Sequence, residues 1–120
     1  SLVYNCKEEI MKNYVIAALS GAALMLSSQV MAGADIEAGK TKATEVCASC
    51  HGADGNSPAP NFPKIGGQHR TYLEKALKDY KSGSRNDPIM AGMAASLSAA
   101  DIENLAFYYS SLSGSLNSHK

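Results

Sequence analysis

Hydrophobic residues recur at helical spacing directly after residue 34 of the chain. Asp35 is suited to cap the N-terminus of a helix that continues to Val46. The residues that recur at helical spacing on one face of this helix are Ile36, Gly39, Lys40, Ala43 and Val46. A glycine inside such a face costs about 1 kcal/mol of helix propensity, so we expect Gly39 to allow the close approach of another backbone.

Two further segments show the same periodicity. The segment 69–83 has a single apolar stripe and ends at Gly83, and its stripe consists of Tyr72, Leu73, Ala76, Leu77 and Tyr80. The third helix is expected to begin at Ser98, which forms a capping-box pattern with Asp101. Its buried face is predicted to contain Ile102, Leu105, Ala106, Tyr109 and Leu112.

The segments between these helices are predicted to be loops. Residues 52–67 carry Pro58, Pro60 and Pro63, and proline fits neither a helix interior nor a central strand. Residues 82–96 form the second loop, and no segment of the chain alternates convincingly at period two. We therefore predict an all-α domain with three main helices and long ordered loops.

Length and charge limit the possible functions. The chain has 120 residues, enough for one small domain, and its 11 basic residues balance 11 acidic ones. This balance gives no indication of nucleic-acid binding. A domain of this size usually needs a disulfide, a metal or a cofactor to be stable.

The first third of the chain is expected to be removed. Residues 11–32 combine a short positive start at Lys12, an uncharged apolar run over 14–26 and small residues before cleavage points after Ala32 or Ala34. This is the pattern of a secretory signal peptide, and the run is shorter than the ~20 residues of a membrane span. Residues 1–10 are interpreted as an upstream extension or artefact. The working domain is then 33–120, located in the periplasm without stable membrane insertion.

The segment "CASCH" carries the chemistry. Cys47 and Cys50 stand three apart, and His51 follows. A redox-active pair should lie near a βαβ unit, for which the chain has no strands. A zinc site needs four ligands, and only His69 and His119 could add to the cysteines, because His51 cannot readily reach the same ion. The pattern Cys-X-X-Cys-His instead fits the covalent attachment of haem c. This attachment takes place outside the bacterial cytoplasm, which agrees with the expected export. An ordinary disulfide is the remaining alternative.

The chain resembles the class I c-type cytochromes, most of all single halves of the two-domain dihaem cytochromes of the bacterial periplasm and their small monohaem relatives. The matching pieces are "CASCHGADGNSPAPNFPKIGGQ", "HRTYLEKALKDYKSG", "NDPIMAGMAASLS" and "DIENLAFYYSSL". They cover nearly the whole of residues 33–120. The resemblance implies a small cytochrome c fold wrapped around one covalent haem c per chain, held through Cys47 and Cys50.

The resemblance also implies the axial iron ligands. His51 is the first, and a methionine on the late loop is the second. The family spacing places this methionine seven residues before Leu97, which selects Met90 over Met93. Pro63 matches the proline whose carbonyl accepts the Nδ1 proton of His51 and so fixes the imidazole ring. Met93 is then expected to pack in the core or at the haem edge.

Other positions follow from the same comparison. Gly39 on the first helix and Leu105 with Tyr108 on the last match the crossing of the terminal helices. Ala43 departs from the family, because many members carry an aromatic ring there. Arg85 is expected either to pair with a haem propionate or to lie free on the surface. His69 is expected to be a solvated surface residue rather than an iron ligand.

An iron with both axial positions filled by protein can only exchange an electron. The expected function is therefore that of a non-enzymatic electron carrier, which docks transiently at its apolar haem edge with redox proteins of the periplasm or inner membrane. This edge is expected to include Ala48, Ala59, Pro60, Ile89 and Met93. Two alternatives remain: a haem peroxidase or ligand-binding sensor with a labile methionine, and an electron-entry subunit of a larger oxidoreductase.

Overall fold

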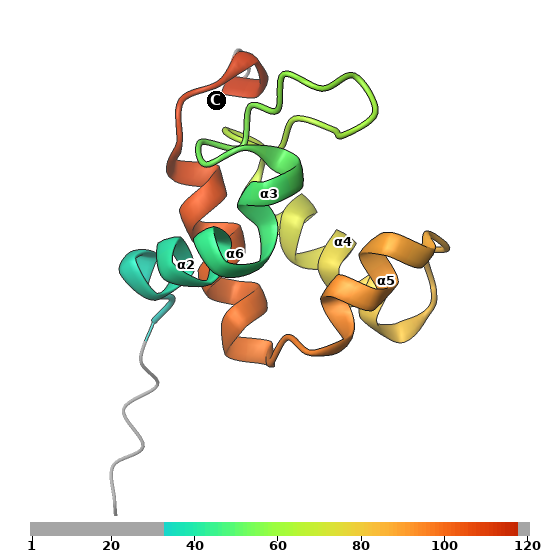
Figure 1. Cartoon of the computed structure of the whole chain (residues 1–120). Helices are drawn as coiled ribbons and strands as arrows, with labels where there is room; N and C mark the ends of the chain where they lie inside the picture. The colour runs from blue at the N-terminus through green and yellow to red at the C-terminus, as the bar shows by residue number, and fades with distance from the viewer. Residues whose placement is uncertain (1–32, 118–120) are drawn as a thin grey trace, which may run out of the picture. The chain divides into compact units, whose positions relative to one another are not determined.

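A computed structural model describes residues 33–117, and these residues contain helices and loops without a strand. Figure 1 shows the helices in chain order. The predicted upstream extension at 1–10 and the signal peptide at 11–32 lie outside the described residues. Within the described residues, no helix has both the length and the apolar character needed to cross a membrane.

The first helical segment begins as predicted but changes its winding before the cysteines. Helix α2 spans Ile36–Lys42, and the side chain of Asp35 caps it by accepting hydrogen bonds from the amides of Glu37 and Ala38 at 2.8 and 3.1 Å. A π-helical turn, η1, follows at Ala43–Cys47, where the amide of Ala48 donates to the carbonyl of Ala43. Such wide turns occur frequently at functional sites.

The short helix α3 continues directly from this turn and spans Ala48–His51. It ends at Gly52, which has a φ of 81°. A side chain is strained at this φ, so glycine is the residue that can turn the chain out of the helix into the loop that follows. Residues 52–69 contain no further helix, in agreement with the predicted loop.

Helix α4 spans Arg70–Ser82, close to its predicted bounds, and Gly83 ends it in the left-handed conformation with a φ of 81°. Its predicted apolar stripe is only partly buried. Leu73 lies in the core, whereas Tyr72 is 49% exposed and accepts a hydrogen bond from Arg85 Nη1 at 3.3 Å. Tyr72 therefore lies at the exposed end of the predicted stripe, where its hydroxyl binds a surface arginine.

The second predicted loop contains a helix. Helix α5 spans Pro88–Ala95, with the side chain of Asp87 accepting from the amide of Met90 at 2.9 Å and Pro88 in the first turn. An Asp-Pro start is a good helix-initiation signal, because proline needs no amide partner in the first turn. Periodicity did not predict this helix, because Ala94 is its only buried residue and the sequence therefore shows no wide apolar stripe.

Helix α6 spans Ala99–Ser111 and is followed by a 3₁₀ turn, η2, at Ser115–Asn117. The predicted capping box is present, because the Ser98 side chain accepts from the Asp101 amide at 3.0 Å while the Asp101 carboxylate accepts from the Ser98 amide at 2.9 Å. Helix α6 packs against both α2 and α4, and α4 packs against α5.

The core lies along α6. Ile102, Leu105, Ala106 and Tyr109 are buried as predicted, while Leu112 is half-buried at the helix end. Gly39 lies in the crossing of α2 and α6, where a Cβ atom would stand 2.2 Å from the backbone oxygen of Asn104 and 2.9 Å from Cβ of Tyr108. The expected close backbone approach at Gly39 is therefore confirmed.

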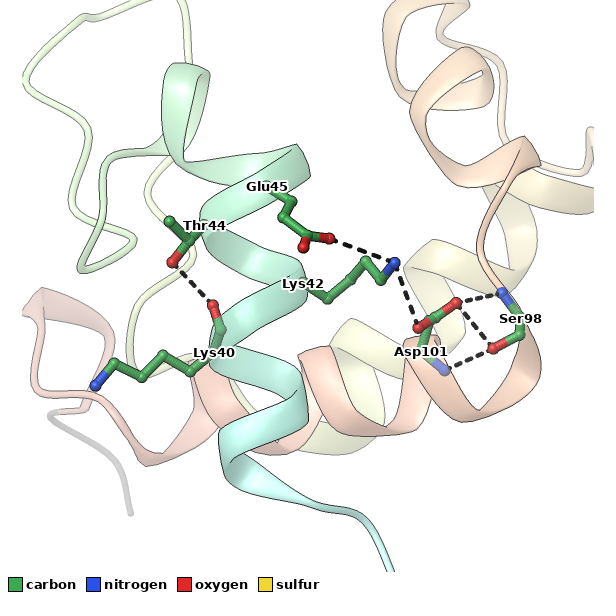
Figure 2. Close-up of polar contacts among 6 residues, drawn as sticks. All are labelled: Lys40, Lys42, Thr44, Glu45, Ser98 and Asp101. Atoms are coloured by element: carbon green, nitrogen blue, oxygen red, sulfur yellow. Dashed lines mark hydrogen bonds and ion pairs between the residues drawn. The ribbon is translucent and has the colours of Figure 1, made fainter.

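A charged contact joins the same two helices at their surface. Figure 2 shows the Lys42 ammonium between the carboxylates of Glu45 and Asp101, at 3.6 and 3.9 Å. Hydrogen bonds from the amide and hydroxyl of Ser98 lower the pKa of Asp101, and the charge of Lys42 adds to this. Asp101 is thus held as a carboxylate that caps α6 and attracts α2.

We expect Ser98→Ala to lower the free energy of unfolding by about 1 kcal/mol, because it removes the acceptor for the Asp101 amide. Because the pKa of Asp101 is lowered on folding, its stabilisation is present above its unfolded value of 3.8 and is lost as the pH falls further. Urea unfolding at pH 7 and pH 3 measures both effects. A difference between variant and parent that is as large at pH 3 as at pH 7 would contradict the coupling to Asp101.

Candidate haem site

A single cavity collects most of the residues that the sequence singled out. Its empty volume is about 700 Å³, and one side opens to solvent. Its walls come from η1, α3, the loop after α3, α4 and α5. The lining residues are Val46, Cys47, Ser49, Cys50, His51, Asn61, Phe62, Pro63, Tyr80, Asp87, Ile89, Met90 and Met93.

The imidazole of His51 is held in one orientation. The side chain is 7% exposed, and Nδ1 lies 2.7 Å from the carbonyl oxygen of Pro63. A carbonyl has no proton to give, so Nδ1 carries the proton and donates it. Nε2 is therefore the nitrogen that remains to bind a metal at the cavity.

The two cysteines reach the same cavity from consecutive helical turns. Both thiols are free in the structure. Burial raises the pKa of the Cys47 thiol, the Tyr109 hydroxyl lowers it, and the neighbouring Cys50 raises it again. The redox-active cysteines of oxidoreductases have a lowered pKa, so this environment does not favour thiolate chemistry at Cys47.

Tyr109 is a neighbour of the cysteines that the sequence interpretation assigned only to the core. Its hydroxyl is buried and has no partner of normal hydrogen-bond geometry in the described chain, although it lies near enough to influence the Cys47 thiol. Burial raises the pKa of this phenol, so the hydroxyl stays protonated. The aromatic positions of α6 mark its buried face but give no indication that one of them touches Cys47.

Both candidate methionines line the cavity from α5. Met90 is half-buried and belongs to the first turn, whereas Met93 is 45% exposed. Because α5 packs on α4 and the cysteine motif lies in η1 and α3, the methionines and His51 enter the cavity from different elements.

The remaining candidates lie around this site. His69 precedes α4 and is exposed, as expected. The guanidinium of Arg85 stacks over the ring of Tyr80 at 4.8 Å, so Arg85 is neither free nor directed only to solvent. Of the apolar edge that was expected, Ile89 and Met93 line the cavity, whereas Ala48, Ala59 and Pro60 do not.

The sequence interpretation missed Phe62, Tyr80 and Asp87 as cavity residues. The sequence positions of two of them could have indicated this. Phe62 immediately precedes Pro63, and Asp87 precedes the Pro88 that begins a helix. Tyr80 was recognised only as part of the apolar stripe of α4, since periodicity cannot tell a side chain facing a core from one facing a cofactor.

The residues present fit a covalently attached haem. Two thiols three residues apart would suit a pair of thioether bonds, Nε2 of His51 would be available to bind iron, and Met90 and Met93 bring thioether sulfurs to the cavity lining. A zinc site receives no such support, because no three His, Cys, Asp or Glu side chains among residues 33–117 gather as metal ligands.

Comparison with known proteins agrees with this fit. Residues 36–113 match the cytochrome c family model. Cytochrome c4 of Pseudomonas aeruginosa is 48% identical over 88 residues, covering 73% of this chain and 43% of that protein. The thiosulfate dehydrogenase electron acceptor of Stutzerimonas stutzeri is 41% identical over 90 residues, covering 71% and 42%.

The same relationship holds for three-dimensional structure. The crystal structure of reduced recombinant cytochrome c4 from Pseudomonas stutzeri matches with a TM-score of 0.64 and 50% sequence identity, covering 70% of this chain and 48% of that one. The chain thus spans about half the length of the cytochrome c4 relatives that it matches.

The fold and the site therefore define a class I c-type cytochrome, and the chain belongs to the cytochrome c family. As a member of this family it is a haem c protein, and its haem is covalently bound.

Proposed function

We propose that this chain carries one electron at a time on a single haem c, attached through Cys47 and Cys50 and bound axially by His51 and Met90. The bound haem supplies a one-electron iron couple. The observation that best supports this proposal is the bond between His51 Nδ1 and the Pro63 carbonyl, because it prepares one imidazole nitrogen for iron in a cavity that also contains two thiols and a thioether.

The protein groups then set the properties of the iron. The Pro63 carbonyl keeps the proton on His51 Nδ1 and fixes the ring, so the same nitrogen faces the iron in both oxidation states. The Met90 thioether favours the reduced state and raises the reduction potential. Phe62 and Tyr80 are half-buried in the cavity lining and would limit the access of water to the iron, which acts in the same direction.

With His51 and Met90 both bound to the iron, no coordination position would remain for a substrate, so the proposed role is that of a carrier and not of an enzyme. Ile89 and Met93 give the cavity mouth an apolar rim, with exposed fractions of 60% and 45%. The charges of the chain balance, so electrostatic steering is weak. We propose brief docking at this rim with redox proteins of the periplasm or inner membrane.

Export is part of the proposal. Residues 11–32 have the pattern of a cleaved signal peptide, which leaves 33–120 as a periplasmic domain. A second candidate function is supported by the S. stutzeri relative, whose name describes the electron acceptor of a dehydrogenase. This chain would then receive electrons from one oxidoreductase partner rather than exchange them among several.

The experiment that tests the proposed function uses the protein purified after export. Its mass should equal that of residues 33–120, or 35–120, plus one haem, and reductive titration should consume one electron per chain reversibly. The ferrous protein should not bind carbon monoxide at neutral pH, because Met90 occupies the sixth position. Ready binding of carbon monoxide would instead favour a peroxidase or a ligand sensor, and a colourless protein would favour a disulfide domain.

A further inference from the structure

Helix α5 is attached to the rest of the domain by few apolar contacts. Ala94 is its one buried residue, and the side chains of Ile89 and Met93 face the cavity and solvent. An alanine side chain contributes a single methyl group, so its burial adds little to the attachment of α5. Polar contacts at the two ends of α5 therefore have a large share in fixing the position of Met90.

The N-terminal end of α5 is held by its own cap. The carboxylate of Asp87 accepts from the Met90 amide at 2.9 Å, so the cap binds the very residue proposed to ligate iron. This contact is local, because Asp87 and Met90 belong to the same turn. It fixes the conformation of the first turn but does not attach α5 to another element.

The C-terminal end is held from another helix. The ammonium of Lys81, near the end of α4, donates to the backbone carbonyls of Ala95 and Leu97 at 2.9 and 2.5 Å. The last carbonyls of a helix, here that of Ala95, have no partner inside the helix and carry partial negative charge, so a lysine is well suited to bind them. Leu97 lies two residues beyond α5. Two other lysines of α4 form ion pairs within the helix instead, Lys75 with Asp79 and Lys78 with Glu74.

We propose that Lys81 is the positioning residue that keeps the sixth coordination site of the iron closed. By binding the carbonyl of Ala95, the last residue of α5, and the carbonyl of Leu97 just beyond the helix, it holds the helix that presents Met90 against α4. Helix α4 also contributes Tyr80 to the cavity wall. This inference rests on the proposed function, because it requires Met90 to be an iron ligand. Loss of the ammonium leaves the ligand in place but lets α5 move away more often.

The test is an imidazole titration of the haem-loaded ferric protein, with the methionine-to-iron absorption band as the signal. An external ligand binds only when the sixth site is open, so its apparent affinity rises with the open fraction. We expect Lys81→Met to increase the imidazole affinity roughly tenfold, because the variant loses the charge-assisted hydrogen bonds that hold α5 in its closed position. Lys81→Arg should restore the parental affinity, because a guanidinium can also reach both carbonyls.

Two controls separate this role from general effects. Lys78→Met removes the same charge from the same helix but touches only Glu74, so its affinity should stay within about twofold of the parent. Asp35→Ala weakens the cap of α2, far from α5 in the chain, and should lower the stability of the domain without raising the imidazole affinity. If Lys81→Met does not accumulate with haem, Lys81→Gln replaces it, with a smaller increase expected.

The outcomes are distinct. If the parent shows the methionine band and Lys81→Met binds imidazole no better than Lys78→Met, the role of Lys81 is refuted while Met90 remains the ligand. If the parent lacks the band and binds imidazole as well as Met90→Ala does, the methionine ligation fails and the inference fails with it.

Discussion

Replacing Met90 with alanine is expected to open the sixth position of the iron and to abolish the methionine-to-iron absorption band. Because thioether ligation raises the potential, the reduction potential should fall by on the order of 0.1–0.3 V, a part of the ~0.8 V range over which axial ligands tune haem. The ferrous variant should also bind carbon monoxide readily. Visible spectra and a redox titration of the loaded protein measure these changes.

Met93→Ala is the matched control, because Met93 lines the same cavity from the same helix but is 45% exposed. It should retain the band and change the potential only slightly. If Met93→Ala loses the band while Met90→Ala keeps it, the two methionines exchange roles and the spacing to Leu97 is a poor guide to the ligand. If neither variant changes the band, the ligand is a group other than these two methionines.

The second large effect is expected for Gly39→Ala. The new methyl group would stand 2.2 Å from the backbone oxygen of Asn104, an atom that cannot move aside without shifting α6. The helices must then separate, and overpacking of this kind costs ~1–3 kcal/mol or more. We expect a loss on the order of 3 kcal/mol in the free energy of unfolding, even though alanine gains about 1 kcal/mol of helix propensity.

Gly92→Ala provides the comparison at a second helical glycine. Nothing lies within 4 Å of a Cβ at Gly92, so only the propensity term remains and the variant should be roughly 0.5–1 kcal/mol more stable. Urea unfolding of the haem-loaded proteins measures both variants. Equal effects of the two substitutions would mean that the crossing at Gly39 relaxes easily, contrary to the contact with Asn104.

Sequence patterns predicted the parts of the fold that depend on local signals or wide apolar faces. The cap at Asp35, the end of α4 at Gly83 and the capping box at Ser98 each involve residues within one helical turn, and each was found at its predicted place. The buried face of α6 followed from its period, because one side of that helix faces α2 and the other faces α4.

The elements that were missed depend on the cofactor or on contacts between distant residues. Helix α5 has almost no buried stripe, since its apolar side chains face the cavity, and periodicity alone could not reveal it. The bond from Lys81 to Ala95 and Leu97 joins residues 14 and 16 positions apart, a separation that no local pattern encodes. The placement of Tyr109 beside Cys47 likewise requires knowledge of how α6 packs on the first helical segment.

The π-helical turn at Ala43–Cys47 has a consequence for how the sequence can vary. Each residue rotates a regular α-helix by about 100°, so deleting one residue from this turn would swing the attachment motif by roughly that angle while α2 kept its crossing with α6. Substitutions at the exposed residues Thr44 and Glu45 keep the number of residues between α2 and the attachment motif unchanged. The number of residues here is therefore under tighter constraint than their identity, because an insertion or a deletion would uncouple helix packing from cofactor attachment.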